Sequence, residues 1–198
     1  LADPVTDAAQ VSICTGDSYE ITATAAGAST IYVYDAETGG TMLGTLPLEV
    51  NPTSDTDYFL AAESELGCLN TGGRTQFSIT INEYPELSIT VSELEIYSGQ
   101  TSEFMVTGAD SYEWTPADNL SCTECDNPIF TAPDNVSSNQ LFQFFVDGNS
   151  NGCITTDSIS VTVLGEQAIA VPGGLEPDGD GMDDTWVIEG LDQYPENE

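Results

Sequence analysis

The chain has 198 residues, of which 34 are Asp or Glu, one is Lys or Arg and none is His, so the formal net charge is −33. Nucleic acid and anionic lipid are bound mainly through Lys and Arg, so we expect neither nucleic-acid binding nor direct lipid binding. The lack of His removes the usual general base of hydrolases and the imidazole ligands of zinc, and we expect no enzyme activity. Because 39% of the residues are apolar, we expect folded domains rather than disorder.

The cysteine content indicates the compartment. Five cysteines in a Ser-, Thr- and Gly-rich chain without Lys are typical of an oxidising, extracellular setting. The chain begins at Leu1 with no signal peptide and contains no long uninterrupted apolar run, and we expect it to be a segment of a longer protein.

Two related copies of one unit follow each other along the chain, with a period of somewhat over eighty residues. The first copy begins with ICTGDSYEITATAAGAS at Ile13 and the second with IYSGQTSEFMVTGADS at Ile96. Further along, Gly67-Cys68 matches Gly152-Cys153, and FSITIN from Phe77 matches ISVTVL from Ile159. Each copy therefore ends on an alternating segment.

Apolar and polar residues alternate over short runs that are bounded by Gly, Asn, Asp and Pro, which indicates half-buried strands. No long helical periodicity is present. Strands at this spacing predict an all-β protein made of tandem Ig-like antiparallel β-sandwiches. The expected strands are Tyr19–Thr24, Thr30–Asp35, Met42–Leu46, Asp57–Glu63, Thr75–Asn82, Leu87–Val91, Thr101–Thr107, Ser111–Thr115, Gln140–Asp147 and Asp157–Leu164.

Short joints divide the chain into three parts. Asn82–Glu86 contains Pro85, which disfavours helix at the preceding residue and extends the chain. A second joint runs from Gly165 to Ala170, and the residues after it have no counterpart in either copy. We expect an Ig-like sandwich at residues 1–82, an Ig-like or PKD-like sandwich at 83–164, and a third element at 165–198.

The repeat suggests how the cysteines pair. We expect Cys14 to pair with Cys68, which would close a long loop and add on the order of 4 kcal/mol in the chain-entropy model. In the second copy the place of Cys14 is taken by Tyr97. Cys153 then stays free or takes one partner of the remaining pair.

That remaining pair is Cys122 and Cys125, in a loop between Pro116 and Pro128. A Cys-x-x-Cys can be a redox site, half of a metal site or a local disulfide. Redox catalysis favours nearby cations, which this acidic loop lacks, and a four-cysteine zinc site would need a second such pair. A loop-tightening disulfide is the favoured interpretation.

Five carboxylates crowd into residues 176–184, interleaved with glycines. Oxygen ligands on a sharply turning backbone suit Ca²⁺, although the spacing is not that of an EF-hand. The alternative is a solvated Asp-Gly turn, and paired carboxylates of a glycosidase are disfavoured because no aromatic cleft residues surround them. The expected metal ligands are Asp178, Asp180, the Met182 carbonyl, Asp183 and Asp184.

The tail VPGGLEPDGDGMDDTWVIEGLDQYP resembles the opening of the gliding-motility-associated C-terminal domain of Bacteroidota surface proteins. That family begins with a Pro-Asn-Gly-Asp-Gly-x-Asn-Asp-x-Trp/Phe pattern, and Asp178 and Asp183 stand here where Asn is usual. The two copies also look like the Ig-like or PKD-like modules that precede this domain. The residues that match the tail pattern are Pro177, Gly179, Asp180, Gly181, Asp184 and Trp186, followed by Ile188–Leu191 and Tyr194-Pro195.

This resemblance implies a stalk and secretion-signal-proximal segment of a cell-surface adhesin, of the giant SprB-like type, exported by the type IX secretion system and linked to gliding motility. Residues 165–198 would be a linker and the first part of a C-terminal β-sandwich secretion domain. The implied partners are the type IX translocon, its shuttle protein and a PorP/SprF-type outer-membrane protein. The implied location is the cell surface, associated with the outer membrane.

Two alternatives stay open. The chain could be the accessory Ig-like and sorting region of a secreted enzyme, or a carbohydrate-binding module. A carbohydrate-binding module needs a surface row of aromatics, for which Tyr32, Tyr34 and Tyr112 are the candidates. Trp114 falls on an expected central strand and is interpreted as a core residue.

Overall fold

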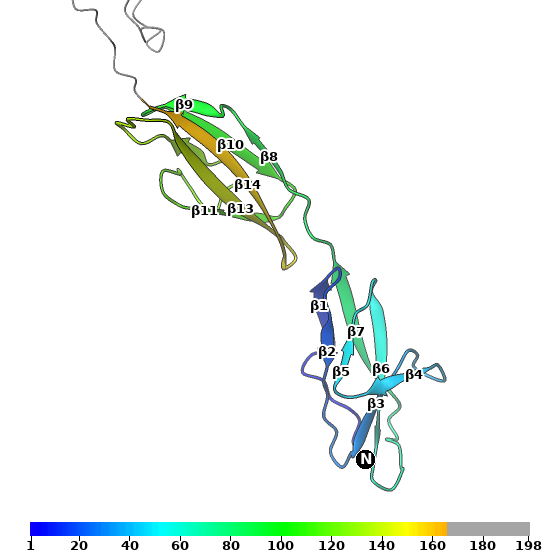
Figure 1. Cartoon of the computed structure of the whole chain (residues 1–198). Helices are drawn as coiled ribbons and strands as arrows, with labels where there is room; N and C mark the ends of the chain where they lie inside the picture. Colours follow the sequence, from blue (N-terminus) through cyan, green and yellow to red (C-terminus); the bar gives the residue numbers. More distant parts are fainter. Residues whose placement is uncertain (166–198) are drawn as a thin grey trace, which may run out of the picture. The chain divides into compact units, whose positions relative to one another are not determined.

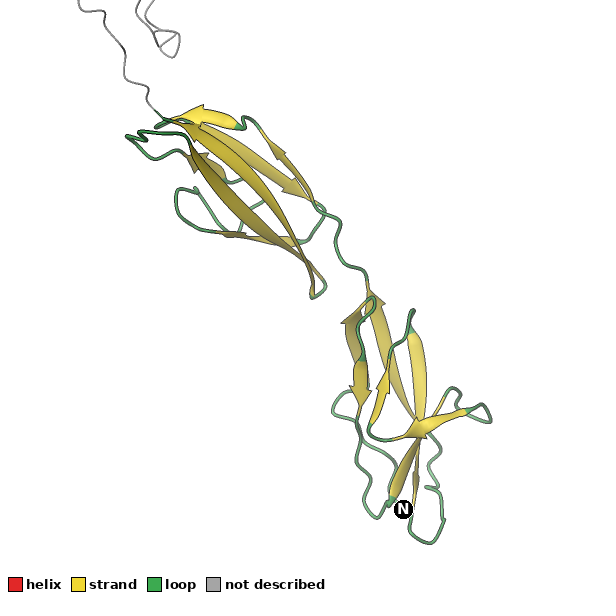
Figure 2. Ribbon diagram, viewed as in Figure 1, coloured by secondary structure: helices red, strands yellow, loops and turns green. Residues whose placement is uncertain are grey.

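The computed structural model describes residues 1–165, and these form β-strands connected by loops, with no helix among them (Figures 1 and 2). This confirms the all-β sandwich class predicted from the alternating pattern. None of the described residues lies in a helix long and apolar enough to cross a bilayer. The strands of the first copy are β1 (Gln10–Cys14), β2 (Tyr19–Ile21), β3 (Thr30–Tyr34), β4 (Met42–Thr45), β5 (Leu48–Val50), β6 (Thr56–Glu63) and β7 (Thr75–Asn82). Those of the second are β8 (Ser88–Val91), β9 (Glu95–Tyr97), β10 (Thr101–Thr107), β11 (Ser111–Thr115), β12 (Ile129–Thr131), β13 (Gln140–Ser150) and β14 (Cys153–Leu164).

The chain divides into two compact units, which are described separately. Unit 1 comprises Leu1–Leu87, Gly108–Ser111 and Asp147–Thr156. Unit 2 comprises Ser88–Thr107, Tyr112–Val146 and the described residues from Asp157 onward. The turn between β13 and β14 therefore belongs to unit 1, whereas most of both strands belongs to unit 2. The domain limits predicted from the sequence stay predictions.

Unit 1 packs a five-stranded sheet, in the order β1-β7-β6-β3-β4, against the pair β2-β5. Alternation directs every second residue of β3, β6 and β7 into the core, where they meet Ile21 of β2. Tyr19 of β2 also stacks on Phe77 of β7, with 5.6 Å between ring centroids. The buried core consists of Ile21, Ile31, Val33, Tyr58, Leu60, Ala62, Phe77 and Ile79.

Unit 2 packs the sheet β12-β10-β8 against the sheet β11-β13-β14-β9, around an aromatic core. Phe104 of β10 lies at its centre, 5.3 Å from Phe144 and 5.7 Å from Trp114 between ring centroids. Phe130 of β12 adds a further contact with Phe144 at 4.9 Å. Tilted and offset rings at these distances are favourable arrangements of aromatic pairs.

Each copy contains one pair of parallel strands. The antiparallel sandwiches predicted from the sequence do not include such a pair. β1 runs parallel to β7, with Cys14 opposite Asn82. β9 runs parallel to β14, with Tyr97 opposite Leu164. The sequence repeat aligns Cys14 with Tyr97 and Asn82 with Leu164, so the register reproduces the alignment of the two copies.

Candidate functional site

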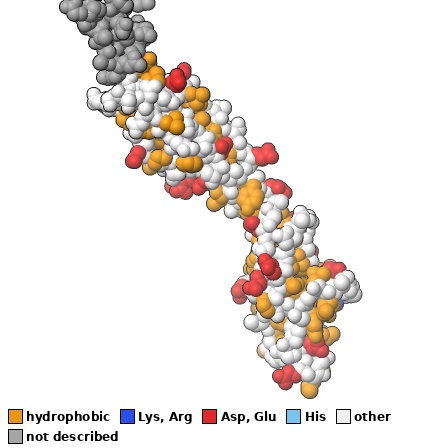
Figure 3. All heavy atoms as spheres, in the orientation of Figure 1, with side chains coloured by type: hydrophobic (Ala, Val, Ile, Leu, Met, Phe, Trp, Pro, Cys, Tyr) orange, Lys and Arg blue, Asp and Glu red, His pale blue; other side chains and the backbone are white. Residues whose placement is uncertain are grey.

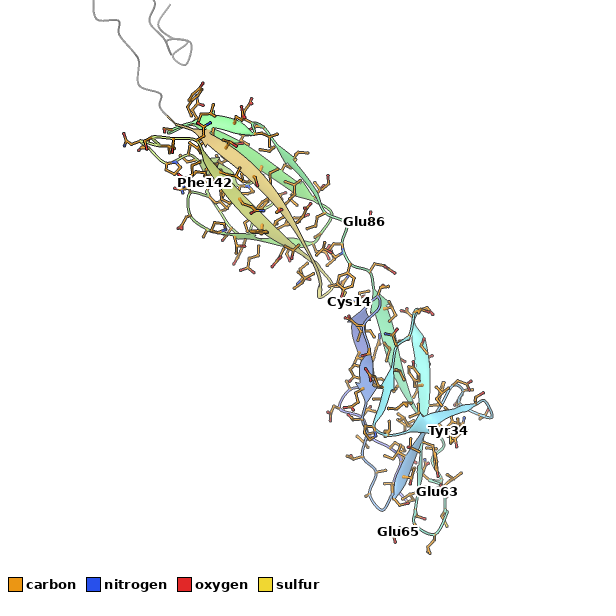
Figure 4. All side chains as sticks on the ribbon, in the orientation of Figure 1. Cys14, Tyr34, Glu63, Glu65, Glu86 and Phe142 are labelled. Atoms are coloured by element: carbon orange, nitrogen blue, oxygen red, sulfur yellow. A yellow bond between two sulfur atoms is a disulfide. The ribbon has the colours of Figure 1, made fainter. Side chains whose placement is uncertain are left out.

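A disulfide joins the end of β1 to the start of β14. The sulfurs of Cys14 and Cys153 are bonded, their Cα atoms are 5.7 Å apart, and the two residues are separated by 139 positions in sequence. Gly152, at φ +88°, forms the turn before Cys153 in a conformation that side-chain-bearing residues rarely adopt. Both cysteines belong to unit 1. Figure 4 labels Cys14 at the end of β1.

Asn82 organises the surroundings of this disulfide. Its side-chain Nδ2 donates to the carbonyl of Asn151 at 2.9 Å, and its own carbonyl accepts from the backbone N–H of Thr15 at 2.9 Å. Nearby, the N–H of Asp110 donates to the carbonyl of Asn149 at 3.0 Å. Cys153 is only 1% exposed. The bond is therefore shielded from solvent and flanked by hydrogen bonds, as expected of a structural rather than an exchangeable disulfide.

The predicted pairing of Cys14 with Cys68 is wrong. β1 is parallel to β7, so Cys14 lies beside Asn82, at the C-terminal end of β7. Cys68 lies in the loop before Thr75, where β7 begins, and it is an exposed free thiol. At about 3.3 Å per residue, the length of β7 separates the two positions by on the order of 20 Å. Figure 4 shows the labelled Cys14 and Glu65, which precedes Cys68, at opposite ends of the first copy.

The second disulfide joins Cys122 to Cys125 within one loop, in agreement with the loop-tightening interpretation. The loop is fastened to Trp114, whose indole Nε1 donates to the carbonyl of Cys125 at 2.9 Å. The backbone N–H of Trp114 also donates to the carbonyl of Thr123 at 2.8 Å. Trp114 is 1% exposed, so its ring is a core residue, as predicted, and its polar edge positions the cysteine loop.

Arg74, the one Lys or Arg of the chain, holds the turn between β3 and β4. Its Nη1 donates to the carbonyl of Gly39 at 2.7 Å and to that of Ala36. Its guanidinium carbon lies 3.4 Å from the centre of the Tyr34 ring, which is a cation–π contact. Sequence reasoning missed this role, although a single cation among so many carboxylates is itself a signal.

The structure does not bring the three candidate sugar-binding tyrosines into one row. Tyr32 and Tyr34 share the outer face of β3, opposite the buried Ile31 and Val33. One face of the Tyr34 ring is covered by the Arg74 guanidinium, and a hydrogen bond with Glu63 raises the pKa of Tyr32. Tyr112 lies on β11, in unit 2.

Carboxylates are spread over the surface that Figure 3 displays, with uncharged residues between them. Among residues 1–165, no three His, Cys, Asp or Glu side chains are grouped as a metal site requires. Some carboxylates are hydrogen-bonded instead: Ser78 Oγ donates to Asp57 at 2.6 Å, and the hydrogen bonds from Ser78 and Gln76 lower the pKa of Asp57. The expected calcium ligands Asp178, Asp180, Met182, Asp183 and Asp184 lie outside the described residues.

Several solved structures resemble the chain at low sequence identity. The fibronectin(III)-like modules of Clostridium thermocellum CbhA match at 12% identity over 85% of this chain and 95% of that one, with a TM-score of 0.44. Murine CEACAM1b matches at 7% identity over 83% of this chain and all of that one, with a TM-score of 0.39. The N-terminal eight Ig domains of Down Syndrome Cell Adhesion Molecule match at 14% identity over 81% of this chain and 24% of that one, with a TM-score of 0.41.

No curated protein matches the chain. Residues 2–82 match the family model described as "Ig-like domain CHU_C associated". The match covers the strands β1 to β7. Residues 2–82 are thus an Ig-like domain of the kind found in surface or extracellular proteins.

Proposed function

We propose that the chain is a stalk segment of a cell-surface adhesin, placed next to a type IX export signal. The observation that supports the stalk role most directly is the disulfide between Cys14 and Cys153, which encloses most of the described residues in one covalent loop. A stalk transmits tension along its length, so the covalent path of that tension decides how far it stretches.

The disulfide shortens that path. When the chain is pulled from its two ends, tension passes through residues 1–14, crosses the sulfur–sulfur bond and continues from Cys153. The residues between the cysteines carry no load while the bond is intact. Since an extended chain spans at most about 3.5 Å per residue, the 139 positions between the cysteines withhold up to roughly 490 Å of extension.

The loaded segments are held by strand pairing at both ends of this path. Before the disulfide, β1 is hydrogen-bonded along its length to β7. After it, β14 pairs with β13 and, near its end, with β9. Separating these ladders under load requires several backbone hydrogen bonds to break together, which favours resistance to extension.

Single-molecule pulling tests the stalk role, with handles at Leu1 and Glu198. We expect the oxidised chain to unfold with a short contour-length gain, and the Cys14→Ser, Cys153→Ser double variant to release roughly 490 Å more. Cys68→Ser is the matched control, since it removes a thiol that takes part in neither disulfide. Equal contour lengths for the oxidised chain and the double variant would contradict a load-bypassing stalk.

The export role rests on the resemblance of residues 171–195 to the gliding-motility-associated C-terminal domain. We infer that the partners are the type IX translocon, its shuttle protein and a PorP/SprF-type outer-membrane protein, and that the parent protein is held at the outer membrane. Surface labelling of the parent protein in cells with and without a working type IX translocon tests this. Undiminished surface labelling without the translocon would exclude this export route.

Ca²⁺ is the cofactor that the acidic residues of this tail favour, because it accepts several hard oxygen ligands at flexible geometry. We infer that Asp178, Asp180, Asp183, Asp184 and the Met182 carbonyl bind one ion, which would order the entry into the export domain.

A further inference from the structure

No unpaired cysteine is left within this chain to form a disulfide with Cys68. Cys14 is bonded to Cys153, and Cys122 to Cys125. The sequence contains five cysteines, so Cys68 is the one left over. It is exposed and free. A leftover thiol in a chain that otherwise forms disulfides indicates an intermolecular or intermodular partner.

The second copy shows what the equivalent cysteine does. Gly67-Cys68 and Gly152-Cys153 occupy matching places in the two copies, and both glycines have positive φ, at +78° and +88°. Cys153 is bonded to Cys14, which ends the first strand of the copy before it. The plan of this disulfide is therefore a turn cysteine of one copy bonded to the strand-end cysteine of the preceding copy.

We propose that Cys68 is half of a second disulfide of the same kind, made to a cysteine at the Cys14 position of an Ig-like module of this plan joined ahead of Leu1. The second copy has Tyr97 at that position, so it offers no partner for Cys68. The bond would extend the same covalent linkage toward the N-terminal side of the chain. This proposal does not depend on how the parent protein is exported.

The loop around Cys68 presents the thiol in a defined place. The backbone N–H of Cys68 donates to Ser64 Oγ at 3.2 Å, and its carbonyl accepts from the N–H of Ser64 at 3.0 Å. Asn70 fastens the loop to β6, because its Oδ1 accepts from the N–H of Ala62 at 2.9 Å. Asn70 Nδ2 also donates to Asp3 at 2.7 Å, which ties the loop to the N-terminal segment.

Two exposed leucines flank this thiol in the sequence. Leu66 is 90% exposed and Leu69 is 56% exposed, on either side of Cys68. In the alignment of the two copies Leu66 stands at the place of Asn151, whose carbonyl accepts from Asn82 of the first copy. Leu66 of the first copy is thus solvent-exposed, whereas Asn151 of the second copy contacts Asn82 at the end of β7. A docked module of the same plan would cover Leu66.

The chemistry requires an oxidant of the disulfide class. The Cys68 thiolate attacks a small disulfide such as oxidised glutathione, which forms a mixed disulfide and releases one glutathione thiolate. The thiolate of the partner cysteine then attacks the Cys68 sulfur and releases the second glutathione. Two protein thiols and one glutathione disulfide thus give one protein disulfide and two glutathione thiols.

A tandem protein tests the proposal directly. Val5 pairs with Thr24 in the first copy, and Ser88 pairs with Thr107 in the second. Both members of the second pair lie 83 positions after those of the first, so Leu1 corresponds to Tyr84. A second copy of residues 1–83 placed directly before Leu1 of the full chain therefore keeps the natural spacing. The added copy carries Cys68→Ser, which leaves Cys14 as its sole cysteine, and Thr15→Ser, which marks its Cys14 peptide by mass.

After oxidation in a glutathione redox buffer, a protease that cleaves after Asp and Glu places Cys14, Cys68 and Cys153 on separate peptides. We expect the marked Cys14 peptide linked to the Cys68 peptide, with Cys14 of the full chain still linked to Cys153 and neither thiol available to alkylation. Retention of the Cys14–Cys153 link shows that the full chain has folded.

The matched control moves the added copy's cysteine along β1, by combining Cys14→Ser with Gln10→Cys. It keeps the number of thiols but displaces one of them by about 13 Å, and we expect Cys68 to stay alkylatable. Three outcomes would overturn the proposal: free thiols at both positions, a Cys68–Cys68 link between two molecules, or linkage of Cys68 to position 10 as readily as to position 14.

Discussion

The guanidinium of Arg74 lies 3.4 Å from the centre of the Tyr34 ring, and its Nη1 donates to the carbonyls of Ala36 and Gly39. One side chain thus joins the start of β7 to the turn after β3. Because the chain contains no other Lys or Arg, this contact has no substitute among its neighbours.

We expect Arg74→Ala to lower the free energy of unfolding by about 1 to 3 kcal/mol, through loss of a cation–π contact and of hydrogen bonds to two carbonyls. Arg74→Lys keeps the charge but loses the planar guanidinium, so its free energy of unfolding should fall between those of Arg74→Ala and the wild type. Urea unfolding followed by fluorescence measures both. If Arg74→Lys matched the wild type while Arg74→Ala did not, net charge rather than this geometry would be responsible.

The disulfide between Cys14 and Cys153 predicts a large effect on stability. Opening a loop of 139 positions removes a constraint on the unfolded chain, so the Cys14→Ser, Cys153→Ser variant should lose about 3 to 5 kcal/mol. Thermal unfolding with and without reductant measures the loss, and the wild type and the variant should unfold at the same temperature once reductant has opened all disulfides. A stability loss in Cys68→Ser, with none in Cys153→Ser alone, would restore the pairing of Cys14 with Cys68.

Trp114 and the local disulfide fix the same loop, so their contributions should not add. Trp114→Phe removes the indole N–H that binds the Cys125 carbonyl, and we expect a loss of about 1 to 2 kcal/mol. The Cys122→Ser, Cys125→Ser variant lacks the disulfide that holds the loop, so Trp114→Phe should lower the free energy of unfolding by less in that background. A double-mutant cycle by urea unfolding measures the difference. Equal costs in both backgrounds would show that the loop and the indole are independent.

The hydrogen bond from Ser78 to Asp57 predicts a pH-dependent contribution. It lowers the pKa of Asp57 in the folded state below the ordinary value of 3.8, so its stabilising effect is present above that value and is lost as the pH falls through the folded pKa. Ser78→Ala should therefore be less stable than the wild type at neutral pH and equal to it in strong acid. Urea unfolding across this pH range measures the gap, and a constant gap would contradict the assignment.

Calcium should raise the melting temperature of the full chain if residues 178–184 bind it. A ligand that binds only the folded state, and is present at a hundred times its dissociation constant, adds about 2.7 kcal/mol to the free energy of unfolding. Mg²⁺ at matched ionic strength controls for general screening of the carboxylates. The triple variant Asp178→Asn, Asp180→Asn, Asp184→Asn should lose the shift. An equal shift in the triple variant would assign the effect to the rest of the acidic surface.

The sequence alone predicted most of the described strands and not their order. Alternation located β2, β3, β4, β6, β7, β8, β10, β11, β13 and β14 at least in part, and missed β1, β5, β9 and β12. β5, β9 and β12 have three residues each, which is too short for that pattern. Alternation also gives no information about strand neighbours, so the parallel pair β1 and β7, which decides the partner of Cys14, was not foreseen.

The candidate site was predictable only in part for the same reason. The repeat identified Cys68 and Cys153 as equivalent, but the pairing depends on which end of the sheet each reaches. Trp114 was predicted as core from its strand position, whereas its hydrogen bond to Cys125 depends on a loop that no periodicity describes.

The covalent loop closed by Cys14 and Cys153 also changes what proteolysis does to the chain. A protease that cleaves one peptide bond anywhere from Thr15 to Gly152 leaves both fragments attached through sulfur. A single nick separates the chain into two pieces only where it falls outside this loop, before Cys14 or after Cys153. In a protease-rich environment outside the cell, most first cuts would therefore be survived without shedding.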